Sequence, residues 1–159
     1  MAASQQFNLL PPEIQSAQLQ DLTNALGEQK PLSLPEFYAQ LPGDQWAAVD
    51  LRQAITAFAK QNSREASIWV NQLPNNEARD TAVSGLVDYL LVGAMPDLEA
   101  AAHWAASSTD PEAQTRRLQR VAKAWNKTNP SGAANAINNS QLSEPVRQQL
   151  LQYLTPANP

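Results

Sequence analysis

The chain has 159 residues, a formal net charge of −4 and no cysteine, and 43% of its residues are hydrophobic. This composition suits one ordinary domain with a buried core, and it excludes disulfides, thiolate metal sites and cysteine nucleophiles. The single histidine, His103, also excludes a histidine metal cluster within one chain.

Prolines and capping residues divide the chain into about nine predicted helices. After a disordered or extended segment at 1–11, we expect helices over 12–26, 34–41, 44–60, 64–73, 75–92, 97–108, 111–127, 130–140 and 143–155, and then a tail or linker at 156–159. Pro12 suits a first helical turn, and Gly27 suits a helix C-terminal cap. Ser63 and Asp110 occupy predicted N-cap positions. No segment alternates apolar and polar residues as a β-strand does, so the sequence predicts an all-α fold.

An internal repeat of 32–35 residues relates these helices to one another. The repeat is aligned on four apolar residues, which we call the anchors: Phe37, Trp69, Trp104 and Ile137. The residues 14, 17 and 21 positions after each anchor are also apolar, apart from a polar residue at the last of these positions in the fourth copy. These offsets place the later positions on one helix face. The predicted repeat core consists of Phe37, Leu51, Phe58, Trp69, Val83, Leu86, Leu90, Trp104, Leu118, Val121, Trp125, Ile137, Leu151 and Leu154.

Each repeat is predicted to be a short helix followed by a longer one, and neither buries its apolar stripe alone, so neighbouring repeats must stack. We therefore expect an all-α, right-handed α-solenoid of stacked helical hairpins, one domain over 12–155. The anchor tryptophans, the Asp-Pro or Asn-Pro helix starts and the period resemble tandem helical-pair repeats of bacterial proteins, and more broadly TPR-like and HEAT-like α-solenoids. The resemblance implies a curved surface that binds proteins or peptides, and it carries no catalytic residues.

No constellation in the sequence predicts a catalytic, metal or cofactor site. Ser107 follows His103 by one helical turn, but no third residue is fixed by the pattern as a catalytic triad requires. Asp97 and Glu99 match no metal-ligand spacing, and acids near a helix start favour the macrodipole. We therefore expect a protein that is not an enzyme and that needs no cofactor.

A basic stripe on the predicted helix 111–127 is the leading candidate for binding a partner. It consists of Arg116, Arg120, Lys123 and Lys127, which lie within about 60° of one another around the helix. The stripe is either a solvated face or a docking surface for an acidic segment, an anionic polymer or a second copy. Trp46, outside the anchor set, is a further candidate contact residue.

Charge is distributed unevenly, because residues 1–112 carry a net −9 and residues 113–159 carry a net +5. This asymmetry permits a homo-oligomer joined through acidic and basic ends, whereas the overall acidity argues against a nucleic-acid partner. No apolar run approaches the roughly 18 residues of a membrane span. Low charge and abundant Gln and Asn favour an exported or periplasmic protein whose signal or anchor lies outside the given chain.

The sequence as a whole predicts a non-catalytic protein–protein interaction module, a helical-repeat scaffold with a protein or peptide partner. Two alternatives stay open. One is a helical accessory domain of a larger cell-envelope enzyme, and the other is a self-assembling structural protein.

Overall fold

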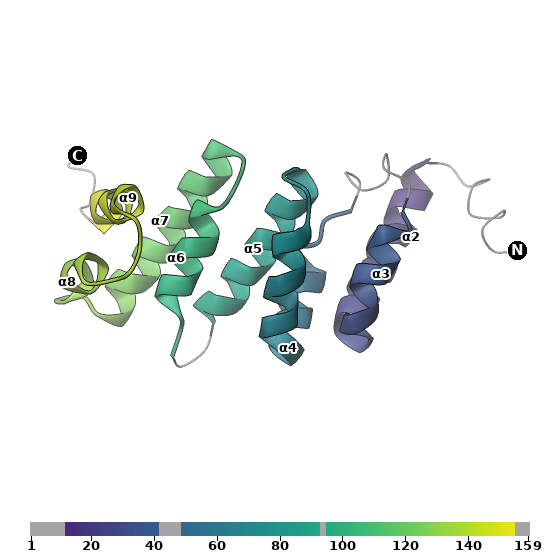
Figure 1. Cartoon of the computed structure of the whole chain (residues 1–159), viewed down its shortest axis with the longest axis horizontal. Coiled ribbons are helices and arrows are strands. Elements are labelled where there is room, and N and C mark those ends of the chain that lie inside the picture. Colours follow the sequence, from purple (N-terminus) through teal and green to yellow (C-terminus); the bar gives the residue numbers. More distant parts are fainter. Residues whose placement is uncertain (1–11, 42–48, 93–94, 155–159) are drawn as a thin grey trace, which may run out of the picture. The chain divides into compact units, whose positions relative to one another are not determined.

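The computed structural model of the protein describes residues 12–41, 49–92 and 95–154 (Figure 1). In these residues it has no strand, which confirms the predicted all-α class. Contacts between Cα atoms divide the chain into a first compact unit that ends at Gly85 and a second that begins at Leu86. The predictions for 1–11, Trp46 and the tail at 156–159 concern residues outside the described part.

Eight α-helices and one 3-10 turn make up the described chain. In order they are α2 (Pro12–Gln29), η1 (Pro31–Ser33), α3 (Leu34–Ala39), α4 (Arg52–Gln72), α5 (Glu77–Leu91), α6 (Leu98–Ala106), α7 (Pro111–Thr128), α8 (Ala133–Asn138) and α9 (Glu144–Leu154). Within the described residues, two of the about nine expected helices are joined in α4 across a break at Asn62.

The start of α4 differs from the predicted helix 44–60, because the described residues 49–51 are not helical. The Asp50 carboxylate accepts a hydrogen bond from the backbone N–H of Arg52 at 2.8 Å, so it satisfies a free donor of the first turn. The Gln20 side chain of α2 bonds both the backbone N–H and the carbonyl of Asp50, at 2.8 and 2.7 Å. These bonds attach the non-helical residues before α4 to α2.

Gly27 does not cap a helix, contrary to the prediction, because α2 continues to Gln29. It lies where α2 packs on α4, and a Cβ atom there would be 2.5 Å from the carbonyl oxygen of Ala54 and 2.6 Å from its Cα. Glycine is therefore required for the close approach of two helix backbones.

The break in α4 lies at Asn62, where φ is −153° and ψ is 84°. Its side-chain oxygen accepts from the backbone N–H of Glu65 at 3.2 Å, so Asn62 and not the predicted Ser63 caps the second segment. On a straight helix, Phe58 and Trp69 would be about 16 Å apart along the axis. Their ring centroids are 6.5 Å apart, so the break brings the second segment against the first.

Trp69 also meets Tyr38 of α3 in an edge-to-face contact, with ring centroids 5.7 Å apart. Tyr38 is 3% exposed, whereas its neighbour Phe37, the predicted anchor, is only half-buried. Two hydrogen bonds of threonine hydroxyls link α5 to α4 and to the residue before it. The Thr56 hydroxyl donates to the carbonyl of Gly85 at 3.1 Å, and the hydroxyl of a threonine in α5 accepts from the backbone N–H of Leu51.

In the second unit, α7 packs against both α6 and α9, and α8 packs against α9. Ala101 and Ala105 of α6 are fully buried, and such small side chains allow close helix packing. In α9 the fully buried residue is Leu150, while the predicted core residues Leu151 and Leu154 are half-buried. One residue rotates a helix face by about 100°, so the core position predicted at Leu151 lies one residue from the buried Leu150.

The predicted repeat core divides into two groups by exposure. Buried positions are Leu51, Phe58, Trp69, Val83, Leu86, Leu118, Val121, Trp125 and Ile137. Half-buried positions are Phe37, Leu90, Trp104, Leu151 and Leu154. The partial exposure of Trp104 leaves part of an indole at the surface of the second unit.

Candidate functional site

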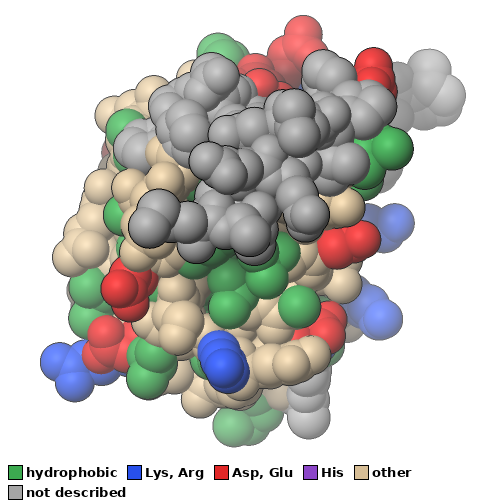
Figure 2. Space-filling view, turned by 90° about the vertical axis from the view of Figure 1, so that its right-hand side faces the viewer, with side chains coloured by type: hydrophobic (Ala, Val, Ile, Leu, Met, Phe, Trp, Pro, Cys, Tyr) green, Lys and Arg blue, Asp and Glu red, His purple; other side chains and the backbone are tan. Residues whose placement is uncertain are grey.

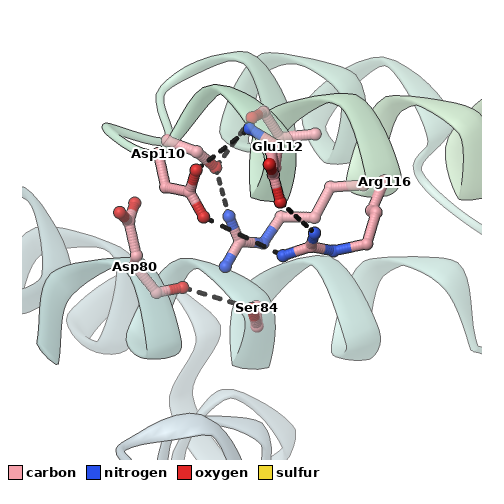
Figure 3. Close-up of polar contacts among 8 residues, drawn as sticks. Asp80, Ser84, Asp110, Glu112 and Arg116 are labelled. Atoms are coloured by element: carbon pink, nitrogen blue, oxygen red, sulfur yellow. Dashed lines mark hydrogen bonds and ion pairs between the residues drawn. The ribbon is translucent and has the colours of Figure 1, made fainter. Parts of the chain in front are cut away.

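The basic stripe of α7 is exposed at all four positions, but two of its cations already have acidic partners. Arg116 contacts Glu112 at 3.4 Å and Asp110 at 3.8 Å, both at the N-terminal end of α7 (Figure 3). Arg120 makes a shorter ion pair, 2.6 Å, with Asp88 at the end of α5. Figure 3 also shows the Ser84 hydroxyl donating to the backbone carbonyl of Asp80 within α5.

Lys123 and Lys127 are the cations of the stripe that make no ion pair or hydrogen bond with any described residue. Lys127 lies in the last turn of α7, where a cation interacts favourably with the helix C-terminus. The free positive charge of the stripe is thus two lysines, which makes it a weaker docking surface than the sequence alone suggests.

Arg117 is a buried cation that the sequence analysis missed. It is 8% exposed, and its guanidinium donates to the Ser108 hydroxyl at 2.6 Å. Its burial could have been predicted from its spacing, because Arg117 lies four residues after buried Ala113 and four before buried Val121, on the same helix face. Its neighbour in sequence, Arg116, points instead to the exposed face.

A hollow beside α6, about 440 Å³ in volume and open to solvent, is the candidate binding site. We call it the α6 hollow. Residues from the start and middle of α6 form one side, and the loop between α8 and α9 forms the other. Its lining consists of Asp97, Glu99, Ala100, His103, Trp104, Gln141 and Leu142.

Hydrogen bonds hold both sides of the α6 hollow in place. Asp97 caps α6, and its Oδ1 accepts from the backbone N–H of Ala100 at 3.0 Å. Glu99 Oε1 accepts from the backbone N–H of Gln141 at 2.7 Å and so ties α6 to the opposite loop. The Arg147 guanidinium donates to the carbonyl of Leu142 at 3.0 Å, which holds that loop against α9. The walls are therefore formed before any ligand binds.

Several polar groups of the α6 hollow remain available to a ligand. The second carboxylate oxygens of Asp97 and Glu99, the His103 ring and the indole N–H of Trp104 make no hydrogen bond or ion pair with the described residues. The sequence placed Asp97 and Glu99 near a helix start and gave His103 a structural or merely exposed position. The structure agrees, and it adds that they share one hollow.

The α6 hollow offers binding groups rather than a metal site or an activated nucleophile. Within the described residues, no three acidic or histidine side chains are placed to hold a metal ion. Ser107, the hydroxyl that the sequence places nearest His103, donates to the backbone carbonyl of Trp104 at 2.8 Å at the end of α6. The two carboxylates accept hydrogen bonds and so suit a ligand rich in hydrogen-bond donors, whereas the indole N–H can only donate.

Apolar surface is also present in the first unit, on the side of α2 and α3 (Figure 2). Among the described residues of this unit, the large apolar side chains that are exposed are Ile14, Leu22, Leu32 and Ile68. Scattered exposed apolar residues are normal in soluble domains, and these carry no polar groups that would orient a ligand.

None of the described helices is both long enough and apolar enough to cross a lipid bilayer. Comparison of the chain with known proteins found no matching family model, no matching curated protein and no matching solved structure. The resemblance to helical-repeat proteins therefore stays a prediction from residue spacing, and function has to be inferred from the geometry of the α6 hollow.

Proposed function

We propose that the protein is a non-catalytic protein–protein interaction module, a helical-repeat α-solenoid over residues 12–155 that binds a protein or peptide segment. The observation that carries the proposal is the α6 hollow, because hydrogen bonds hold its two carboxylates while one oxygen of each stays without a partner among the described residues. Such a preformed site orders few groups on binding and so loses little entropy. Tryptophan, which forms part of its wall, is enriched where interfaces gain most of their energy.

Equivalent repeat positions support the repeat part of the proposal. Leu51, Val83 and Leu118 each follow an anchor by 14 residues in the sequence, and each is 0% exposed. Val83 and Leu118 lie inside α5 and α7, and Leu51 directly precedes α4; burial at an equal offset from each anchor is expected of stacked repeats. The fourth copy departs by one residue, as is common for a terminal repeat.

A variant that fills the α6 hollow tests this function. Ala100→Gln places a longer, uncharged and helix-compatible side chain in the lining. Ala134→Gln makes the same change at an exposed position of α8 that does not line the hollow. Tagged native and variant proteins would be used to recover partners from a lysate of the source organism, with quantitative mass spectrometry.

We expect a partner that is recovered with the native protein and with Ala134→Gln but is depleted with Ala100→Gln. Circular dichroism and thermal unfolding must show that Ala100→Gln is folded. If a correctly folded Ala100→Gln variant recovers the same partners in the same amounts, the α6 hollow is not the binding site and the proposal fails.

Self-assembly is a second candidate, favoured by the two unpaired lysines of the stripe and by the spare carboxylate oxygens of the hollow. Such charges attract most strongly at low ionic strength. Light scattering over a range of protein concentrations in low salt would therefore detect assembly. A monomer at the highest concentration removes this candidate.

A further inference from the structure

We infer that the α6 hollow recognises the guanidinium group of an arginine side chain, presented by a basic segment of the partner protein. This inference rests on the proposed function and specifies the chemistry of its ligand. Four features of the hollow support the inference. They are its negative charge, the carboxylate oxygens that lack a hydrogen bond, the indole in its wall, and the loop that hydrogen bonds hold opposite α6.

The charge of the α6 hollow favours a cation. Asp97 and Glu99 bring two negative charges, and no lysine or arginine is part of the lining. The start of α6 adds a helix dipole equivalent to roughly half a positive charge, which offsets only part of this. Arg147 behind the loop is ion-paired with Glu144. Glu144 has a lowered pKa because Gln148 and Arg147 hydrogen-bond to it, and its charge compensates the arginine.

The spare acceptors match a guanidinium. Asp97 and Glu99 each use one oxygen to hold the fold, which leaves one oxygen on each carboxylate for a ligand. Guanidinium is a planar group with five N–H donors in a fixed arrangement, so it can donate to two carboxylates at once. An ammonium group is a compact point charge without that fixed geometry.

The indole of Trp104 gives the α6 hollow a partly exposed aromatic wall. Guanidinium groups stack on aromatic faces and gain cation–π attraction there, most strongly with tryptophan. A volume of about 440 Å³ with an open mouth admits a side chain from a segment lying across the surface. Because Glu99 and Arg147 already hold the opposite loop, binding needs little rearrangement.

Two matched peptides test the inference. Acetyl-Gly-Arg-Gly-amide would be titrated into the ¹⁵N-labelled protein and compared with the same peptide carrying citrulline, which has a similar shape but no charge. We expect the arginine peptide to shift the indole N–H of Trp104 and the backbone N–H signals of Ala100 and Gln141. The citrulline peptide should bind at least about tenfold more weakly, as expected for losing a charge-assisted hydrogen bond.

A charge-removing variant provides the second arm. Asp97→Asn with Glu99→Gln keeps the side-chain oxygens that accept from Ala100 and Gln141, so the walls stay formed while both charges are lost. This variant should bind the arginine peptide at least about tenfold more weakly than native. Glu36→Gln, which removes an exposed charge of α3 in the first unit, should bind it as the native protein does.

Three results would overturn the inference. They are equal binding of the arginine and citrulline peptides, absence of a saturable shift with the arginine peptide, and stronger binding of a neutral oligosaccharide such as β-1,4-linked N-acetylglucosamine. The last result would assign the α6 hollow to a sugar. If Ala100→Gln loses a protein partner but arginine is not preferred, the interaction module stands and only the arginine inference fails.

Discussion

Replacing Gly27 by alanine tests the close approach of α2 to α4. The added Cβ would be 2.5 Å from the carbonyl oxygen of Ala54 and 2.6 Å from its Cα. Carbon atoms in good contact are about 3.5–4.0 Å apart, so the two helices have to separate locally by about 1 Å. Both obstructing atoms belong to the backbone, and no side-chain rotation can relieve the overlap.

The expected loss follows from two opposing terms. Overpacking of a well-packed contact costs about 1–3 kcal/mol. Alanine in a helix interior is about 1 kcal/mol more favourable than glycine, and this gain is smaller near the end of α2. We therefore expect Gly27→Ala to lower the free energy of unfolding by about 1–2 kcal/mol.

Urea unfolding followed by far-ultraviolet circular dichroism measures this loss. Gly132→Ala is the matched control, because the three atoms nearest a Cβ there all belong to the carboxamide of Asn129, the nearest at 2.5 Å. That exposed side chain can turn aside, so we expect a change below about 1 kcal/mol. The reasoning is refuted if Gly27→Ala is as stable as the native protein while the control is also unchanged.

Three further predictions concern single interactions. Asn62→Ala removes the acceptor of the Glu65 N–H and should lower the free energy of unfolding by about 1 kcal/mol in thermal unfolding, whereas Asn62→Asp should lose less. Burial raises the pKa of Tyr38 from 10.0 to about 12. The unfolded chain therefore loses this proton first, so stability should fall as the pH rises above about 10, and less steeply in Tyr38→Phe under alkaline titration. Arg120→Ala removes the ion pair with Asp88, whose side chains are 46% and 18% exposed. It should cost about 1 kcal/mol or less, and the loss should shrink in high salt.

Each of these has an outcome that would contradict it. Equal stability of the alanine and aspartate variants at Asn62 would show that its side chain does not cap the second segment of α4. An alkaline profile unchanged in Tyr38→Phe would assign the loss of stability to other groups. A salt-independent loss of several kcal/mol in Arg120→Ala would show that the pair is more deeply desolvated than its exposure indicates.

Capping and proline signals were sufficient to predict many helix ends because they act within a few residues. Asp110 caps α7 as predicted, with its carboxylate accepting from the N–H of Glu112 at 3.0 Å. The break near residue 62 was also expected, but the cap is Asn62 and not Ser63. Neighbouring residues that both suit an N-cap cannot be separated by sequence alone, because the choice depends on where the chain must turn to place Trp69 against Phe58.

The candidate site was predictable only in its parts. His103, Trp104, Asp97 and Glu99 drew attention in the sequence, but Gln141 completes the hollow from about forty residues further along the chain. The basic stripe was predictable as a set of residues, but its contacts were not. Its spacing was visible in the sequence, whereas the pairing of Arg120 with Asp88, from another helix, was not.

The capping residues and the proline-punctuated apolar pattern determined by themselves that the described chain is helical and where most of its helices lie. Those properties depend on short-range hydrogen bonds and on the period of one helix. Only the tertiary structure decided that Gly27 is a contact and not a cap, that Leu150 and not Leu151 is buried in α9, and that half of the stripe is neutralised. Packing of distant segments decides such points, because a one-residue rotation or an ångström of approach changes which side chains meet.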